Sequence, residues 1–155
     1  MAFTNSNDYI TGRKSAPTPS GCELVSVRFT IDLGTADLAL NTIGQVGILP
    51  AGCVPEDVLV DGTDMDSSTA AVIFQVGIWD GSSANLSTAA ADGGAAWGST
   101  TAVNTSFKQR LTFSSNAIDL VTAAQTDRKL GVKVTTAPTA AVAGTLGVTL
   151  RYRAA

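Results

Sequence analysis

The chain has 155 residues, the length of a single domain, and 45% of them are hydrophobic whereas only 15% are charged. It contains no histidine, which excludes Ser-His-Asp and Cys-His triads, HExxH zinc sites and cupin-type histidine clusters. Its net charge of −3 argues against a nucleic-acid partner, because nucleic-acid binders usually carry a strongly basic balance. We therefore expect one folded domain that is not an enzyme and holds no cofactor.

The N-terminal segment, residues 1–21, differs in kind from the rest of the chain. It spaces apolar side chains through polar filler and ends in a proline-containing stretch that disfavours helix. Two interpretations stay open: a frayed tail, or an extended arm that becomes ordered against a partner through apolar anchors and two basic side chains. The candidate contacts in this arm are Phe3, Tyr9, Ile10, Arg13 and Lys14.

Residues 22–155 carry the pattern of β-strands. In residues 25–33 every odd position is apolar and every even position polar, which predicts a strand with one buried face. Residues 72–79 predict a strand buried on much of both faces, ending in a turn at Asp80-Gly81. Further strands are predicted near residues 47–49, 54–60, 107–113, 130–135 and 146–153. We expect the last two to form an antiparallel pair joined by a longer loop.

Long amphipathic helices, which a parallel α/β fold needs between its strands, are missing from the pattern. Only a short helix near residues 116–125 is conceivable, and residues 84–105 have the composition of a surface loop around Trp97. The sequence therefore predicts an all-β fold, an antiparallel jelly-roll-like sandwich or barrel over residues 22–155 with an extended N-terminal arm.

The two tryptophans have different expected roles. Trp79 follows the most apolar strand, so we expect it in the core or at an interface. Trp97 lies in a glycine-rich segment, where its ring either folds back on the core or contacts a neighbouring molecule. It is the sixth candidate partner contact.

No motif predicts a catalytic or metal site. Asp61, Asp64 and Asp66 form the one carboxylate cluster, but their spacing fails the EF-hand pattern, so a solvated turn is favoured over a Ca²⁺ site. Neither cysteine, Cys22 or Cys53, has an evident base, and no Gly-x-Ser-x-Gly, Ser-x-x-Lys or Walker motif is present. We expect both cysteines to be reduced and at least one to be buried, although a bridge between them stays open.

The expected compartment follows from the same sequence. The first eight residues lack the basic and apolar regions of a signal peptide, and no apolar run approaches the roughly 18 residues of a membrane span. We therefore expect assembly in a cytoplasm, without a membrane partner.

Charge is distributed unevenly along the chain. Residues 29–107 hold nine acidic and no basic residues, whereas residues 108–155 hold seven basic and two acidic ones. Either these charges intermix on one folded surface, or they form complementary faces that dock identical subunits or a larger lattice.

Several segments resemble those of a known protein family. Residues 49–54, 57–60, 76–81 and 143–153 are similar in pattern to the jelly-roll cement (decoration) proteins on the heads of tailed bacteriophages. The resemblance covers roughly residues 23–153. It implies a dimer or trimer that binds the outside of an icosahedral capsid, bridges neighbouring major capsid protein subunits and lays extended termini across the shell.

The expected function is therefore that of a capsid decoration protein in the virion, assembled in the cytoplasm of the bacterial host. Two alternatives remain: another virion component, such as a head-fibre base or tail protein, or a carbohydrate-binding jelly roll. In the second alternative Trp97 is the sugar platform and the loop from Asp61 to Asp66 the cation site.

Overall fold

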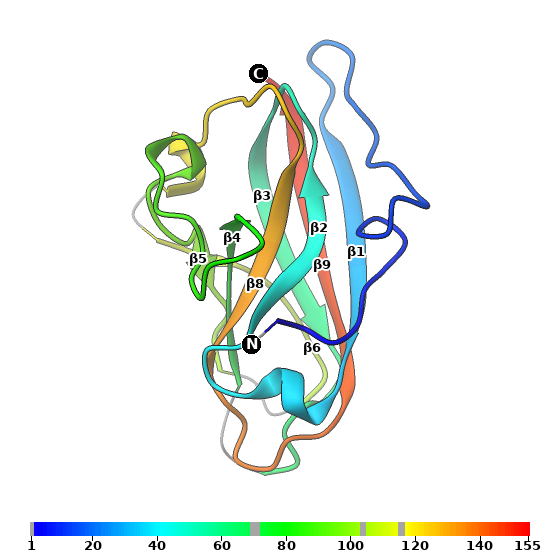
Figure 1. The fold of residues 1–155 in the computed structure, drawn as a ribbon, viewed down its shortest axis with the longest axis vertical. Coiled ribbons are helices and arrows are strands. Elements are labelled where there is room, and N and C mark those ends of the chain that lie inside the picture. Colours follow the sequence, from blue (N-terminus) through cyan, green and yellow to red (C-terminus); the bar gives the residue numbers. More distant parts are fainter. Residues whose placement is uncertain (1, 69–71, 103–104, 115–116) are drawn as a thin grey trace.

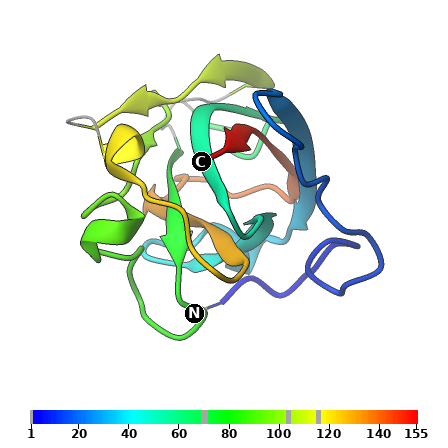
Figure 2. The same cartoon turned by 90° about the horizontal axis from the view of Figure 1, so that it is seen from above.

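The structure is a computed structural model, and it describes residues 2–68, 72–102, 105–114 and 117–155. These residues form two antiparallel β-sheets packed face to face (Figures 1 and 2). The first sheet has the strand order β1 (Val25–Leu33), β9 (Gly144–Ala154), β3 (Cys53–Gly62), β6 (Phe107–Arg110). The second has the order β2 (Ile43–Leu49), β8 (Arg128–Thr136), β4 (Ile73–Trp79), β5 (Gly98–Ser99), β7 (Thr112–Phe113). The prediction of an all-β, jelly-roll-like sandwich is confirmed.

The helical content of the described residues is limited to three short 3₁₀ segments: η1 (Thr35–Leu38), η2 (Ala90–Asp92) and η3 (Ala117–Leu120). The helix expected near residues 116–125 is thus reduced to η3, and Asn116 lies outside the described residues. Ile118 and Val121 are buried, so the apolar spacing that suggested a helix fixes a 3₁₀ turn and the residue after it against the core. The segment expected as a loop, residues 84–105, contains η2 and β5, and its residues 103–104 are not described.

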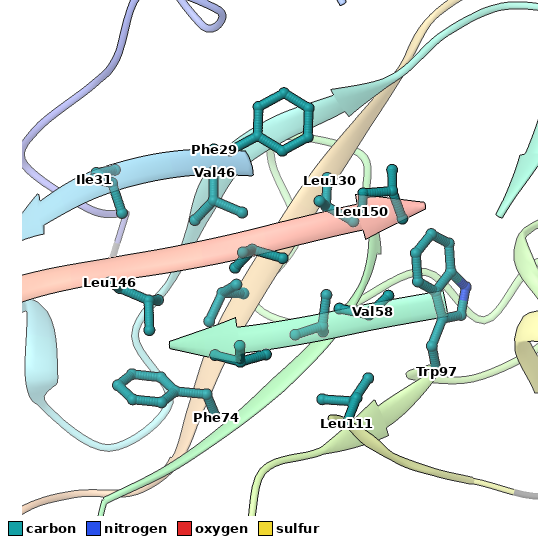
Figure 3. Close-up of a cluster of buried hydrophobic side chains, with 14 of the residues drawn as sticks. Phe29, Ile31, Val46, Val58, Phe74, Trp97, Leu111, Leu130, Leu146 and Leu150 are labelled. Carbon is teal, nitrogen blue, oxygen red and sulfur yellow. The ribbon is translucent and has the colours of Figure 1, made fainter. Parts of the chain in front are cut away.

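The core lies between the sheets and follows from the alternation of the strands (Figure 3). In β1, Phe29, Ile31 and Leu33 are at most 3% exposed, and the polar residues between them face solvent. In β9, Leu146, Val148, Leu150 and Tyr152 are fully buried in the same way. A strand with one apolar face is stable here because the opposite sheet covers that face.

The central strand β4 is buried on both sides, as its sequence predicts. Phe74 and Val76 are in the main core, whereas Trp79 packs with Ile43 and Leu86 in a second, smaller cluster. Residues 80–97 fold over this side of the sheet, and the indole N–H of Trp79 donates to the Ser83 carbonyl oxygen at 2.8 Å. The expected core position of Trp79 is confirmed.

The predicted turn after β4 is also present. Gly81 adopts a left-handed conformation (φ +92°), and one carboxylate oxygen of Asp80 accepts hydrogen bonds at 2.8 Å from the backbone N–H groups of Ser83 and Ser82. These bonds lower the pKa of Asp80 to about 2.

The predicted pairing of the last two strands is wrong. β9 lies between β1 and β3 in the first sheet, and β8 lies between β2 and β4 in the second. Residues 137–143 therefore cross from one sheet to the other instead of closing a hairpin. Alternation tells which face of a strand is buried but not which strand lies beside it.

The strand predicted over residues 107–113 is divided between the two sheets. β6 pairs with β3, and β7 pairs with β5. Leu111 stands between them, 3% exposed, with its N–H bonded to the Val58 carbonyl oxygen at 2.9 Å. The chain changes sheet at this residue, and its side chain enters the core (Figure 3).

Candidate partner-binding surface

The N-terminal arm, residues 2–21, lies against the sandwich of its own chain (Figures 1 and 2). Phe3, Tyr9 and Ile10 are partly buried and pack against the main core cluster. The ring of Tyr9 meets the ring of Phe29 edge-on at 4.8 Å. In this structure the apolar surface that these three candidate contacts cover belongs to the same chain, and their contact with a partner stays a prediction.

Small residues in β2 make room for the aromatic rings. A Cβ atom at Gly44 would lie 2.4 Å from the Phe3 ring, and one at Gly47 would lie 2.4 Å from the Phe29 ring. Both distances are far below van der Waals contact, so only glycine lets the rings reach the strand. The two glycines can be seen in the sequence, but their role follows only once the structure shows which aromatic rings face β2.

The arm lies along the line where the edges of the two sheets meet, which we call the β1/β2 seam. The side-chain N–H₂ group of Asn7 donates to the Thr30 carbonyl oxygen of β1 at 2.9 Å and to the Val46 carbonyl oxygen of β2 at 2.8 Å. Asn5 donates to the Asp32 carbonyl oxygen at 2.7 Å. One asparagine thus bonds to both edge strands.

A buried carboxylate fixes the beginning of the arm. Asp37 in η1 is 1% exposed, and its carboxylate accepts hydrogen bonds at 2.9 Å from the backbone N–H groups of Thr4 and Gly34. The hydroxyl of Thr4 donates to the same carboxylate. A buried charge is tolerated when donors surround it, so Asp37 and the arm stabilise each other.

Arg13 and Lys14 lie in an exposed turn of the arm. Their side chains are 79% and 62% exposed and form ion pairs with Asp8, at 4.0 and 3.7 Å. Exposed pairs of this kind contribute little to stability. Both residues remain candidates for contact with a partner.

Trp97 belongs to the core. It is fully buried, and its indole N–H donates to the Asp92 carbonyl oxygen at 2.9 Å (Figure 3). The candidate role of Trp97 as a partner contact or sugar platform is therefore corrected. The glycine-rich segment around it folds inward because β5, at Gly98–Ser99, pairs with β4 and β7.

The carboxylates of residues 61–66 serve three separate structural roles. Asp61 forms an ion pair with Arg28, and one carboxylate oxygen of Asp64 accepts the backbone N–H of Asp66 at 3.1 Å. Asp66 is 1% exposed and holds two loops together, accepting the backbone N–H groups of Ala140 and Ser68 at 3.2 and 3.1 Å. Among the described residues, no group of three acidic or cysteine side chains is placed to hold a metal ion.

The titration of Asp66 reflects this environment. Burial alone would raise its pKa, but hydrogen bonds from the Ser68 side chain and from the backbone N–H groups of Ala140, Ser68 and Thr139 outweigh that effect. The pKa of Asp66 is therefore lowered. The loop is a hydrogen-bonded structural element.

The uneven charge distribution resolves into ion pairs within the chain. All four arginines of the basic C-terminal part contact acidic residues from the middle segment: Arg110 and Arg151 with Asp57, Arg128 with Asp92, and Arg153 with Glu56. The charges intermix on one folded surface, which is the first of the two interpretations above. Glu56 and Asp57 together pair with three of these arginines.

The two cysteines are free, with Cys53 buried and Cys22 exposed. Burial raises the pKa of the Cys53 thiol, and the charge of Asp127 adds to the shift. The expectation of reduced cysteines with at least one buried is confirmed.

Exposed apolar side chains, which the strand patterns of the sequence do not indicate, lie at both ends of the sandwich. Leu40, just after η1, is 58% exposed, and Val142, in the β8–β9 connection, is 41% exposed; both segments lie at the lower end in Figure 1. Leu24 and Leu120, each 59% exposed, lie before β1 and in η3, toward the upper end. Strand periodicity cannot detect them because they lie outside strands.

Three comparisons with known proteins found matches among solved structures. No protein-family model and no curated protein matches the chain. Among solved structures, a chain of the capsid of Ralstonia phage GP4 is 25% identical, with a TM-score of 0.74 and 97% of each chain covered. A chain of the cyanophage Pam1 capsid is 17% identical, with a TM-score of 0.53 and 92% and 94% of the two chains covered. The second likeness is one of fold alone.

The first match includes most of the N-terminal arm. Coverage of 97% leaves only about five of the 155 residues unmatched, whereas the arm has about twenty. The match therefore extends into the arm. The described residues contain no helix that is long and apolar enough to cross a membrane.

Proposed function

We propose that this protein is a structural component of a bacteriophage virion that binds the outside of the capsid and bridges neighbouring major capsid protein subunits. The observation that carries the proposal is the likeness to the Ralstonia phage GP4 capsid chain over 97% of both chains. The likeness supports a structural role in a virion. The external position, the bridging role and a dimeric or trimeric state are our inferences from the resemblance of the sequence to cement proteins.

The activity in this proposal is binding alone. Interface area that exists only in the assembled shell stabilises the shell, because the bound state is favoured by mass action. Many copies, each held weakly, act together on one particle. The four C-terminal arginines already have acidic partners within the chain, so we expect apolar and uncharged groups to dominate the contact with the capsid.

We propose the lower end of the sandwich as the surface that rests on the capsid. Two of its connections, residues 34–42 and 137–143, expose Leu40 and Val142 and carry one charged residue, the buried Asp37. A third connection, the segment after β3, adds the exposed Asp64 and the buried Asp66, which bonds to Ala140. The upper end exposes Leu24 and Leu120 beside the charged side chains of Glu23, Asp119 and Asp127. Interface cores are depleted in charge, which favours the lower end.

The proposal is tested by co-sedimentation of the purified protein with expanded heads that lack it and with unexpanded proheads. We expect saturable binding to expanded heads and a higher temperature of head disruption once they are decorated. Binding to neither particle would contradict the proposal and favour another virion component, such as a head-fibre base or tail protein.

A matched pair of variants then tests which end docks. We expect the double substitution L40S/V142S to weaken binding to heads at least tenfold. We expect L24S/L120S, which removes similar exposed surface at the other end, to bind as the unmodified protein does. The opposite result would assign the upper end, and circular dichroism of both variants checks that the fold is retained.

A further inference from the structure

Two separate stretches of the chain form the contact between the arm and the seam that it fills. In the first part of the arm, residues 2–10, the contacts with the seam come from residues 3–10; on the body, the hydrogen-bond acceptors for this part all lie between Thr30 and Val46. The bonds run from arm side chains to edge-strand carbonyl oxygens, or from Thr4 to the Asp37 carboxylate. Within the described residues, the arm shares no strand ladder with β1 or β2. Any other copy of the chain presents the same acceptors.

An exposed turn connects this arm to the rest of the chain. Residues 11–15 are all exposed, and Gly12 has a left-handed conformation (φ +75°). The turn is closed by backbone hydrogen bonds from Thr11 to the Asn7 carbonyl oxygen and from Arg13 and Lys14 to the Asp8 carbonyl oxygen, at 2.8–3.0 Å. Because these groups face solvent, water replaces the bonds when the turn opens, and the cost of opening is small.

The turn also stands away from the sandwich. A hollow of about 280 Å³ separates it from β1, lined by Asp8, Tyr9 and Lys14 on the arm side and by Thr30 and Asp32 on the body side. In Figure 2 the corresponding dark-blue loop projects beyond the rest of the molecule. Beyond the turn the chain is docked again, because Pro19 is buried and the Tyr152 hydroxyl donates to the Pro17 carbonyl oxygen at 2.6 Å. The undocked part of the arm is therefore residues 11–15.

We propose that on the assembled capsid the arm is exchanged between copies: residues 2–10 of one copy fill the β1/β2 seam of a neighbouring copy, and residues 11–15 are the hinge. This inference rests on the proposed function, since the capsid lattice is what holds the copies side by side. Every arm contact is made again in the neighbour, so the two arrangements differ only in the turn. The hinge, fully extended, spans about 17 Å, so the exchange requires copies whose docked Ile10 and Ala16 positions lie within about that distance.

The lattice decides between the two arrangements through local concentration. In dilute solution the chain's own arm fills the seam, because a short tether gives it an effective concentration of the order of 1 mM. On the shell a neighbouring arm is present at a similar concentration. Exchanged arms then connect copies to one another in addition to the capsid protein beneath them.

Disulfide trapping tests the exchange. The experiment uses the double variant F3C/G44C in a C22S background, so that the exposed native thiol is removed and only the buried Cys53 remains. A Cβ atom at Gly44 would lie 2.8 Å from the Cβ atom of Phe3, so a shift of about 1 Å by the arm gives disulfide geometry. The protein is oxidised in dilute solution and on decorated heads, and both samples are run on non-reducing gels. Each single variant, which lacks one of the two thiols, is the matched control.

We expect internally bridged monomers in dilute solution and more than half of the protein in covalent multimers on heads, with none from the single variants. Only internally bridged monomers on heads would overturn the exchange. Free thiols on heads would also overturn it, because the arm would then have left every seam for the capsid protein. If the variant and the unmodified protein both fail to sediment with heads, the proposed function fails. The exchange is then decided at about 1 mM protein in solution, where multimers support it and monomers reject it.

Discussion

The sandwich has two long seams where the edges of its sheets meet, and the chain closes them differently. At the β6/β7 seam the polypeptide crosses from sheet to sheet, with Arg110 ending one edge strand, Thr112 beginning the other and Leu111 buried between them. At the β1/β2 seam the chain connects the two strands only at one end, through residues 34–42, and does not cross between them along their length. Side chains of the arm cover it, Asn7 by hydrogen bonds and Phe3 by its ring.

The β6/β7 seam is thus closed permanently by the chain itself, whereas the β1/β2 seam has a cover that can be removed. The crossing at Leu111 cannot open without loss of strand pairing in both sheets. The arm can leave and return while both sheets keep their own hydrogen bonds. Open sheet edges invite pairing with other chains, so each seam needs a cover. In a protein that assembles on a lattice, the removable cover is the one that can connect copies.

The largest effect is expected at the permanent seam. Leu111→Ala should lower the free energy of unfolding by about 3 kcal/mol, because it leaves a cavity between the sheets. Urea denaturation followed by circular dichroism measures this loss. Leu120→Ala, which shortens a leucine that is 59% exposed, is the control and should change stability by less than about 0.5 kcal/mol. Equal effects of the two substitutions would show that the crossing does not hold the fold together.

Two glycines of β2 allow the same substitution to be compared against a core ring and against a ring of the arm. Gly47→Ala places a Cβ atom against the Phe29 ring of the core and should lower global stability by about 1–3 kcal/mol. Gly44→Ala places one against the Phe3 ring of the arm, which can move away. We expect Gly44→Ala to leave the urea midpoint nearly unchanged and to make residues 2–10 sensitive to proteolysis.

The outcome that contradicts the comparison is a global loss of similar size from both glycine variants. The arm would then be part of the cooperative core instead of a removable cover. A substitution of Phe3 to Ala in the Gly44→Ala background checks the cause, because removing the ring should abolish any additional loss.

The strands of the fold could be predicted where alternation is strong. The pattern of residues 25–33 gives β1 with its actual bounds, and the inward positions Phe29, Ile31 and Leu33 are as buried as expected. Alternation likewise predicts which residues of β9 are buried, but it does not predict that β9 pairs with β1 and β3. Strand order depends on contacts distant in sequence, such as Val27 with Leu150, which period-2 patterns do not encode.

The arm shows a different limit of sequence analysis. Its apolar residues could be identified as anchors, but their target could not. The space for Phe3 is made by Gly44, 41 residues further along the chain, and the acceptors for Asn7 are backbone carbonyl oxygens that every residue has. Trp97 illustrates the same limit: its glycine-rich surroundings suggest exposure, yet the short strand beside it turns the ring inward.

A smaller, local effect is expected from the bonds of Asn7. Asn7→Asp replaces a donor to the Thr30 and Val46 carbonyl oxygens with a repelling carboxylate. The backbone N–H of Thr4 should then exchange with solvent about tenfold faster, the equivalent of about 1.4 kcal/mol in local opening, without a change in the exchange of Leu111. Asn5→Asp, which removes one such bond in place of two, is the control and should give a smaller acceleration. Unchanged exchange at Thr4 in Asn7→Asp would mean that the aromatic rings alone hold the arm.

The smallest effect concerns the point where the arm joins the body and depends on pH. Burial raises the pKa of Tyr152 to about 12, with smaller contributions from Cys53 and Tyr9. Because the folded pKa lies above the unfolded value of about 10, the neutral phenol stabilises the fold fully below pH 10, and this contribution is lost as the pH rises toward 12.

Tyr152→Phe should cost about 1 kcal/mol at neutral pH, since the hydrogen bond to Pro17 is removed, and should flatten the decline in stability between pH 10 and 12. Urea denaturation across this pH range measures both effects, and Tyr9→Phe, which removes only a minor contribution to the shift, should keep most of the decline. A decline as steep in Tyr152→Phe as in the unmodified protein would assign the alkaline loss to other groups, and the junction would then contribute only its single hydrogen bond.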